Sequence, residues 1–428
     1  MPEIAPPRGT RDILPPESHA WRWLLDAHRA VVESYGYQAV DTPIIESTDL
    51  FARGVGADTD IVDKQMFTFV DRGGRSLTLR PEGTAGVMRA VLGKHLEQEL
   101  RPVRVHYAGP FFRAENPQRG RYRQFAQVGV ECIGERSPAL DAEVIEMAWR
   151  FFERLGVSGL QLQLNTLGDR EDRARYREAL ISYYTPLREE LCDDCKRRLE
   201  TNPLRLLDCK TDARFAEKAP LIWDLLDAGS KEFFTTVATM LEDADVVAHI
   251  NPRIVRGLDY YTDTVFEIWH ESLHGQQNSL GGGGRYDGLA EALGFASTPG
   301  VGYALGVDRS LLVAEQLGVV PAPAAICDAL VVSVESPQAR RAAAVARSLR
   351  GASLHGAPLR VVLDVSDRRL DRKLRNADRL AASLAIIIGE DEVRGGTVTV
   401  RDLARRAQEQ VAETDMVAAV NRVLERPS

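Results

Sequence analysis

The sequence predicts an α+β domain with antiparallel strands, followed by a smaller α/β domain. Apolar residues at 103–107 and 126–132 flank a long polar loop, which is typical of two strands that pair antiparallel. Beyond residue 326, strand-like and amphipathic helical segments alternate over roughly 100 residues, and this alternation favours a compact α/β domain. A chain of 428 residues is long enough for both domains.

Apolar spacing and turn residues predict the elements of the first domain in order. Residues 18–35 have helical spacing, and Gly36 follows as a stop. Residues 38–46 indicate a strand, and Pro43 within it favours an edge or interface position because proline donates no ladder hydrogen bond. The later elements are a hairpin over 67–70 and 76–80, a helix over 85–92, a mostly helical, charged insertion over about 168–248 and a strand over 253–268.

A segment rich in Pro and Ala separates the two domains. We expect a first domain over 1–320, a linker over 321–326 and a second domain over 327–428. The second domain is predicted to contain strands over 329–334, 359–363, 383–388 and 396–400, and helices over 337–349 and 367–380.

Composition and charge exclude several classes of protein. Hydrophobic residues make up 44% of the chain and charged residues 27%, and no apolar run is long enough for a membrane span. Residues 1–7 lack the basic start and apolar core of a secretory signal, so we expect a cytoplasmic protein. The formal net charge of -8 argues against a general nucleic-acid coat but allows a local basic patch.

One such basic patch is the segment from Arg101 to Arg123, which holds six Arg and one acid, Glu115. Guanidinium groups pair with phosphate oxygens, and an aromatic ring offers a stacking face for a flat base. The segment therefore suits a ligand with a polyphosphate and a base, and a solvated basic hairpin is the alternative interpretation.

The order of residues in this segment decides between the two interpretations. Residues 112–125, Phe-Arg-Ala-Glu-Asn-Pro-Gln-Arg-Gly-Arg-Tyr-Arg-Gln-Phe, closely resemble the second signature motif of class II aminoacyl-tRNA synthetases, in the version of the histidine-specific family. Segments 35–46, 256–267, 281–287 and 300–309 match the same family in the same order. The resemblance implies a catalytic domain with a central antiparallel sheet, a C-terminal α/β anticodon-binding domain, and a homodimer joined through residues 35–46.

The resemblance also implies a set of ATP contacts. Arg113 would grip the α-phosphate and Arg121 the outer phosphates. Glu115 would accept from the adenine amino group, while Phe125 and Arg309 would stack on the two faces of adenine, with Arg309 also touching the γ-phosphate. ATP would be a substrate, with Mg²⁺ bound mainly through its phosphates, and no metal ligand is assigned to the protein.

The resemblance also implies a histidine pocket, with residues from the segments 112–125, 256–267 and 281–287, from residues 80–84 and from the strand that follows the motif loop. Arg256 would face Arg113 across the α-phosphate, and these two would be the catalytic residues. An ammonium needs acceptors, and an imidazole needs one donor and one acceptor. The expected histidine-binding residues are Glu82, Thr84, Arg113, Gln127, Glu131, Arg256, Tyr260, Tyr261 and Tyr286. Asp263 departs from the pattern, because a small residue such as Gly is expected there, and this puts the local loop shape in doubt.

For tRNA, the resemblance assigns Gln118, Arg119 and Arg123 to the acceptor end. No anticodon contact is assigned, because basic and acidic residues are interleaved over 364–379, as on a solvated helix.

The implied activity is ligation of L-histidine to histidine tRNA through histidyl-adenylate. The main alternative is a catalytically silent relative that regulates the first enzyme of histidine biosynthesis. Such proteins usually lack the C-terminal domain and depart from the segment 256–261, and this chain retains both. A synthetase for threonine, proline or glycine is disfavoured by the tyrosine pair, Tyr260 and Tyr261, and by Glu131.

Three of the five Cys lie close together in sequence. Cys192, Cys195 and Cys209 have partly zinc-like spacing, but a fourth ligand is not obvious and no His is close by. We therefore expect reduced thiols, buried or half-buried, in preference to a zinc site.

Overall fold

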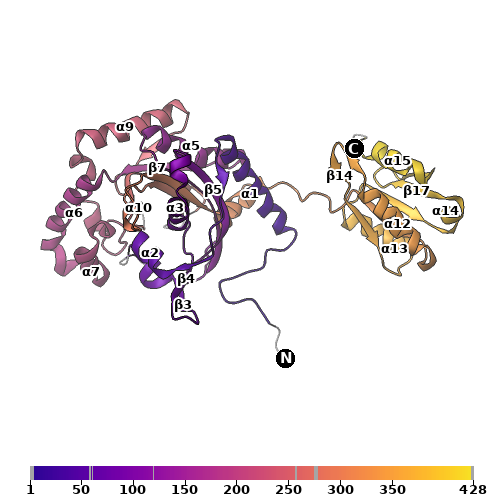
Figure 1. Ribbon diagram of the computed structural model, residues 1–428, viewed down its shortest axis with the longest axis horizontal. Coiled ribbons are helices and arrows are strands. Elements are labelled where there is room, and N and C mark those ends of the chain that lie inside the picture. Colours follow the sequence, from indigo (N-terminus) through magenta and orange to yellow (C-terminus); the bar gives the residue numbers. More distant parts are fainter. Residues whose placement is uncertain are drawn as a thin grey trace. The chain divides into compact units, whose positions relative to one another are not determined.

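The computed structural model describes residues 4–56, 59, 61–118, 120–255, 258–273 and 278–425 (Figure 1). The chain divides into two compact units between Pro321 and Ala322, and each unit has its own sheet and hydrophobic cores. None of the helices in the described ranges combines the length and apolarity that a bilayer crossing needs.

An eight-stranded sheet organises the larger unit, and most of its neighbouring strands run antiparallel, which confirms the predicted fold class. The β1–β5 and β7–β8 pairs are parallel. In spatial order the strands are β1 (Gln38–Ala39), β5 (Val103–Phe112), β6 (Gln124–Ile133), β11 (Gly300–Gly306), β10 (Ser279–Arg285), β9 (Thr262–His270), β7 (Leu160–Thr166) and β8 (Ala248–Ile250).

Alternation along the strands separates the two faces of this sheet. Val128, Val130 and Cys132 of β6 belong to the core under the helices, whereas the intervening Gln127 and Glu131 point to the other face. The helices over the first face are α1 (Glu17–Ser34), α5 (Pro138–Arg154), α9 (Ala228–Asp243) and α11 (Val307–Gln316). The second face is left for the site.

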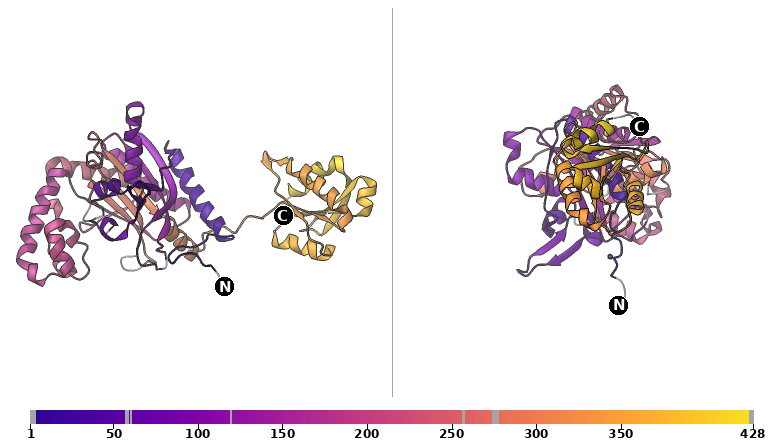
Figure 2. Two further views of the ribbon diagram at one scale, coloured as in Figure 1. Left: turned by 60° about the horizontal axis from the view of Figure 1, so that its bottom comes forward. Right: turned by 90° about the vertical axis from the view of Figure 1, so that its right-hand side faces the viewer.

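The helical insertion packs against the second face of the sheet. Its side chains, among them Tyr184 and Leu204, share one core with Tyr107, Tyr260 and Tyr261. Figure 2 shows α6 and α7 grouped at the end of this unit away from α1. The insertion comprises α6 (Arg170–Tyr184), α7 (Asp193–Thr201), α8 (Ala213–Ala216) and the 3₁₀ turns η2 (Thr185–Glu190), η3 (Pro203–Leu206) and η4 (Ile222–Asp224).

The prediction of one strand over 38–46 was wrong. The structure has β1 in the large sheet and β2 (Ile45–Ser47) in a separate sheet of order β2-β4-β3, with Pro43 between them. Proline supplies no ladder donor, and the chain changes sheets at this point.

The predicted hairpin is confirmed as β3 (Phe67–Val70) and β4 (Ser76–Leu79), which pair antiparallel. The remaining elements are α2 (Thr48–Gly54), the π-turn η1 (Ile61–Gln65), α3 (Thr84–Gly93), α4 (Leu96–Glu99) and α10 (Leu289–Ala292).

The smaller unit has a five-stranded sheet with helices on both faces, so the predicted α/β class is confirmed. Side chains of an inner strand, β12, alternate between two cores: Val331 lies in one, and Leu330 and Val332 lie in the other. In order the strands are β15 (Val361–Asp364), β12 (Ala329–Ser333), β16 (Leu384–Ile388), β17 (Thr397–Asp402) and β18 (Ala407–Ala412), of which the first three are parallel. The other elements are η6 (Ser336–Gln338), α12 (Ala339–Arg350), β13 (Ser353–Leu354), β14 (Ala357–Pro358), α13 (Leu370–Arg379), α14 (Glu390–Gly395), η7 (Glu413–Asp415) and α15 (Met416–Leu424).

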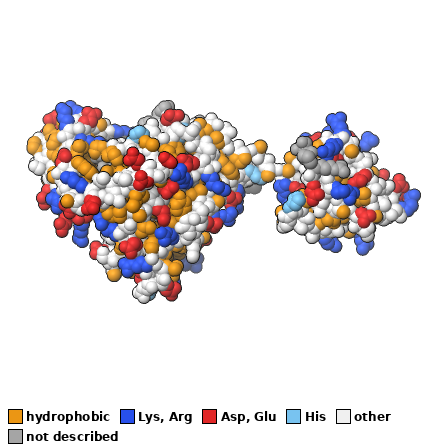
Figure 3. Space-filling view, turned by 90° about the horizontal axis from the view of Figure 1, so that it is seen from above, with side chains coloured by type: hydrophobic (Ala, Val, Ile, Leu, Met, Phe, Trp, Pro, Cys, Tyr) orange, Lys and Arg blue, Asp and Glu red, His pale blue; other side chains and the backbone are white. Residues whose placement is uncertain are grey.

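Charged side chains of both signs are interspersed over the surface of this smaller unit. Figure 3 shows this mixture on one face. On α13, for example, Arg375 pairs with Asp371 at 3.1 Å, and both side chains are exposed. The pairing agrees with the expectation of a solvated helix in this segment.

Candidate active site

A cavity of about 770 Å³ opens on the second face of the large sheet. All five residues predicted to contact ATP line it: Arg113, Glu115, Arg121, Phe125 and Arg309. Six of the predicted histidine-binding residues line it as well: Arg113 again, together with Glu82, Thr84, Gln127, Tyr260 and Tyr261. The folded sheet thus brings segments from four distant parts of the chain into one chamber.

The floor of the cavity is bare backbone from the glycine strand β10. A Cβ atom on Gly282 would lie 2.2 Å from the carbonyl oxygen of Phe266, and one on Gly283 would lie 1.9 Å from that of Gly302. Neither clash can be relieved by side-chain motion, because the opposing atoms belong to the backbones of β9 and β11. The glycine run is therefore required for close strand packing, and it leaves open space above Gly281 and Gly282.

Five Arg side chains line the cavity, and three of them, Arg113, Arg121 and Arg309, belong to the set predicted to bind ATP. Arg113 donates from Nε to the carbonyl of Pro81 at 3.0 Å, and Arg309 donates from Nη1 to the carbonyl of Ser279 at 2.6 Å. Arg121 pairs with Glu115 at 3.4 Å. Burial, together with the repulsion of Arg121 and Arg113, lowers the pKa of Arg309 to about 10. Such clustered positive charge is stabilised when an anion enters.

The pKa of Arg113 is also lowered. Burial is the main cause that lowers its pKa, and the nearby charge of Arg121 acts in the same direction. Its guanidinium carbon lies 5.2 Å from the ring centroid of Phe125, within cation–π range. One face of Phe125 is therefore already covered by Arg113.

An acceptor for a ligand donor lies opposite these cations. The Oε1 atom of Gln127 is buried and has no hydrogen-bond partner within the described ranges. The Glu82 carboxylate accepts the backbone N–H groups of Thr84 at 2.6 Å and Ala85 at 3.1 Å, so it also stabilises the start of α3. Burial raises the pKa of Glu82, and the neighbouring Arg113 opposes that shift.

Two predicted histidine-binding residues, Glu131 and Tyr286, lie behind the cavity wall and do not line it. The Glu131 Oε1 atom accepts the Thr84 hydroxyl at 2.7 Å and the Tyr107 hydroxyl at 3.3 Å. The Tyr286 hydroxyl donates to its Oε2 atom. Burial raises the pKa of Glu131 to about 8. Glu131 thus fixes the hydroxyl groups that support the cavity.

The tyrosine pair forms part of the wall. Tyr260 and Tyr261 are buried with ring centroids 4.7 Å apart, and Tyr260 meets Tyr286 edge-on at 5.7 Å. Asp263 stands where the family pattern has a small residue such as Gly. Its backbone has φ = 42°, in the left-handed region. Its Oδ2 atom accepts a hydrogen bond from Arg136 at 3.0 Å, and Asp tolerates this region better than most residues.

The loop between β5 and β6 folds back on itself at its tip. The backbone of Gln118 donates to Arg121 at 3.1 Å and accepts from it at 2.8 Å. Arg123 donates from Nε to the carbonyl of Glu115 at 3.2 Å, so its side chain braces the loop. Two predicted site residues, Arg119 and Arg256, lie outside the described residues.

Sequence reasoning missed several residues at the cavity. Arg198, Arg205 and Lys210 of the helical insertion line it, and no local sequence signal indicates this because the approach is tertiary. Tyr107 was also missed as a partner of Glu131. A signal existed in its strand partner Gly129, where a Cβ atom would lie 2.4 Å from the Tyr107 ring.

The raised pKa of Glu131 predicts a specific pH dependence of stability. Because the folded chain holds this proton more tightly than the unfolded chain, the contribution of Glu131 to the free energy of unfolding falls as pH rises from 4.5 to about 8. Glu131→Gln removes this titration. We therefore expect the stability of wild type relative to Glu131→Gln to decline across that range in denaturant unfolding at a series of pH values.

The exposed residue Glu135, just beyond β6, provides a matched control. Glu135→Gln is expected to keep the wild-type profile. A stability difference between wild type and Glu131→Gln that stays constant over the whole range would contradict the assigned pKa.

Comparison with known proteins agrees with this geometry. The family model described as histidyl-tRNA synthetase matches residues 9–168 and 206–309, and that of an anticodon binding domain matches residues 328–422. A histidine–tRNA ligase of Halalkalibacterium halodurans is 42% identical over 98% of both chains. One of Corynebacterium urealyticum is 45% identical over 98% of this chain and 96% of its own.

A solved structure extends the likeness to three dimensions. The apo histidyl-tRNA synthetase of S. aureus superposes with a TM-score of 0.83 at 35% identity, covering 98% of this chain and 100% of the other. The motifs, the site geometry and these full-length matches agree, and the chain belongs to the histidyl-tRNA synthetase family.

Proposed function

We propose that this chain is a histidine–tRNA ligase that activates L-histidine with ATP and transfers it to the 3′ end of histidine tRNA. The observation that carries the proposal is one cavity lined both by the guanidinium groups of Arg113, Arg121 and Arg309 and by Gln127, whose buried Oε1 atom has no hydrogen-bond partner among the described residues. A polyphosphate needs the first feature, and an amino-acid ammonium needs the second. The regulatory alternative is disfavoured because the chain retains the C-terminal unit, residues 328–422 of which match an anticodon binding domain.

In the activation step, a histidine carboxylate oxygen attacks the α-phosphorus of ATP. The new P–O bond forms histidyl-adenylate as the bond to the bridging oxygen breaks, and that electron pair leaves with diphosphate. Negative charge develops on the α-phosphate oxygens, where a fixed cation lowers the barrier most. Arg113 is held for this role by the Pro81 carbonyl and the Phe125 ring. We assign Arg256 to the opposite side of the same phosphate.

The β- and γ-phosphates and the adenine base of ATP would occupy the part of the cavity near Arg121 and Arg309. Arg121 and Arg309 would bind the β- and γ-phosphates, and Glu115 would accept from the adenine amino group. Phe125 and Arg309 would enclose the base, with Arg113 on the far face of the phenyl ring.

Mg²⁺ would neutralise phosphate charge when bound. Glu115 and Glu267 are carboxylates of the cavity wall, and neither belongs to a group of three or more candidate metal ligands among the residues that the structure describes. We therefore propose that the ion is held mainly by ATP phosphates, with at most one or two protein oxygens.

Histidine selection rests on buried polar groups. Gln127, Thr84 and Glu82 would receive the ammonium, and Tyr260 and Tyr261 would enclose the imidazole. Glu131 and Tyr286 would act from behind, by holding the Thr84 and Tyr107 hydroxyls in place. A substrate with a smaller or apolar side chain would leave these buried polar groups without hydrogen-bond partners. That cost strongly disfavours such substrates.

Transfer requires the tRNA acceptor end at the same cavity. Gln118 and Arg123 lie on the β5–β6 loop and would meet it together with Arg119, and the C-terminal unit would bind the anticodon. Because charged tRNA is consumed in translation, we propose that the protein works in the cytoplasm.

We further propose a homodimer joined near β2 and β3. Four large apolar side chains are exposed there: Ile44 at 41%, Ile45 at 47%, Phe69 at 41% and Val70 at 69%. An apolar group of this kind is usually covered in the working protein.

Analytical ultracentrifugation is expected to show a dimer that weakens in Phe69→Ser, whereas a wild-type monomer at micromolar concentration would contradict the proposal.

The activation step can be measured alone by exchange of labelled diphosphate into ATP. We expect exchange with histidine and with none of the other nineteen amino acids. Arg113→Ala should lower histidine-dependent exchange by about 10²–10³-fold, as expected for a group that binds developing charge. Arg394→Ala, which removes an exposed guanidinium of α14, serves as the control and should leave exchange unchanged. Normal exchange in Arg113→Ala would exclude its assigned role.

The two steps should separate on truncation. Deleting residues 327–428 removes the C-terminal unit but leaves the sheet and cavity of the first unit complete. We expect exchange to survive and the rate of tRNA charging to fall sharply, because the anticodon contact is lost. Equal loss of exchange and charging, measured on the same folded preparation, would argue against this division of labour.

A further inference from the structure

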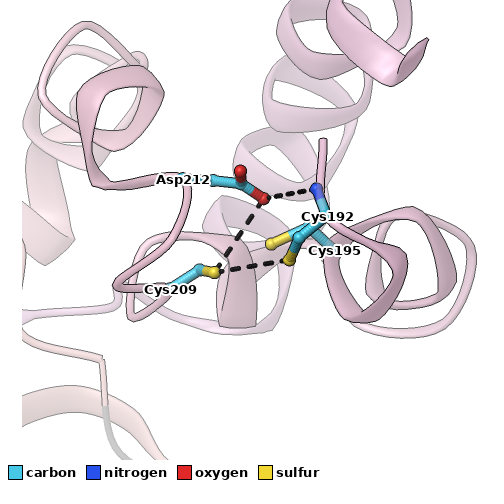
Figure 4. A group of neighbouring side chains, drawn as sticks. All are labelled: Cys192, Cys195, Cys209 and Asp212. Atoms are coloured by element: carbon cyan, nitrogen blue, oxygen red, sulfur yellow. Dashed lines mark hydrogen bonds between the residues drawn. The ribbon is translucent and has the colours of Figure 1, made fainter. Parts of the chain in front are cut away.

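The helical insertion brings three thiols and one carboxylate to a single point. Cys192, Cys195, Cys209 and Asp212 each offer a ligand atom, and these atoms all lie within 4.8 Å of one another (Figure 4). The Sγ atoms of Cys192 and Cys209 are 3.7 Å apart, and the Cys209 Sγ atom lies 3.9 Å from Asp212 Oδ2. Sequence analysis found no fourth ligand, and the fold supplies it as Asp212.

These separations match the edges of a zinc tetrahedron. With Zn–S bonds of about 2.3 Å, two sulfur ligands at the tetrahedral angle lie about 3.8 Å apart. A sulfur and a carboxylate oxygen lie about 3.6 Å apart on the same basis. A [4Fe–4S] cluster, in which each protein ligand binds a different iron atom, would hold the ligands farther apart. The site therefore has the size of one metal ion.

Local sequence explains how the four ligands meet. Cys192 precedes α7 and Cys195 lies in its first turn, while Cys209 and Asp212 follow η3 with the same two-residue spacing. The two pairs are thus Cys-x₂-Cys and Cys-x₂-Asp, arranged as two knuckles that face each other. The backbone N–H of Cys192 donates to Asp212 Oδ2 at 3.0 Å and orients the carboxylate, as partners outside the coordination sphere do in metal sites.

Burial and charge favour a cation at this point. Cys195 is fully buried and Asp212 is 4% exposed. In the part of the chain that the structure describes, no Lys or Arg lies within ion-pair distance of Asp212; Arg214, which pairs with Glu190, acts on it only from farther away. A buried carboxylate without a cation is costly, and a divalent ion removes that cost. All five cysteines are free thiols, so no disulfide competes for these ligands.

We propose that Cys192, Cys195, Cys209 and Asp212 bind one structural Zn²⁺ ion. Three sulfurs with one oxygen in tetrahedral geometry select zinc, and four protein ligands leave no open position for catalysis. The ion ties the start of α7 to the segment that follows η3. Arg198, Arg205 and Lys210, which flank the ligands in sequence, line the active-site cavity, so the ion fixes the part of the insertion that reaches it.

Metal content of the full-length protein, purified without chelator, tests the proposal independently of ligase activity. We expect about one zinc per chain by elemental analysis. After dialysis against a chelator, Cys209→Ser and Asp212→Asn should retain less than about a tenth of the wild-type zinc. Asp194→Asn removes an exposed carboxylate of the same segment and should retain all of it, as should Cys327→Ser in the other unit.

A second measurement on the wild type avoids variants that fail to fold. Metal-free protein titrated with Co²⁺ is expected to bind one equivalent with a thiolate-to-cobalt charge-transfer band and the visible spectrum of a tetrahedral site. Four results would overturn the proposal: no zinc in the native protein together with no uptake of Co²⁺, full zinc retention in both ligand variants, iron in place of zinc, or a Cys192–Cys209 disulfide in the protein as purified.

Discussion

The mutual repulsion of three guanidinium groups is the constraint on which the rest of this structure depends. Arg113 and Arg121 lie on the β5–β6 loop and Arg309 lies at the start of α11, and burial with repulsion between these cations lowers the pKa of both Arg113 and Arg309. Arg113 and Arg309 donate to the backbone carbonyls of Pro81 and Ser279, which are neutral groups. Most of the positive charge of these two side chains can therefore act on a ligand. The large sheet supplies the rigidity that keeps such an arrangement from relaxing. The glycine strand β10 leaves room at the floor of the cavity. The helices on the other face of the sheet form the hydrophobic core that supports it.

Strand periodicity and motif order predicted most of this arrangement. The polar loop expected between two apolar runs is the connection between β5 and β6, which pair antiparallel. Motif order placed Arg309 at the start of α11, where the structure has it. These predictions succeed because they depend on neighbours along one strand or one turn.

Other features depend on contacts that sequence spacing does not reveal. Glu131 accepts the hydroxyls of Thr84, Tyr107 and Tyr286, a network that its sequence position does not reveal, and its contact with the substrate stays a prediction. The strand expected over 38–46 breaks because the chain passes from one sheet to another near Pro43. Asp212 escaped notice because a carboxylate is an uncommon partner for three thiols. The roles assigned to Arg119 and Arg256 remain predictions.

A crystal structure with histidine and a non-hydrolysable ATP analogue tests the central claim most directly. We predict that the α-phosphate accepts hydrogen bonds from Arg113 and Arg256 on opposite sides, and that the ammonium donates to the Oε1 atom of Gln127. The β- and γ-phosphates should lie against Arg121 and Arg309. Phosphates bound away from Arg113, or Arg113 and Arg256 in separate cavities, would contradict the account.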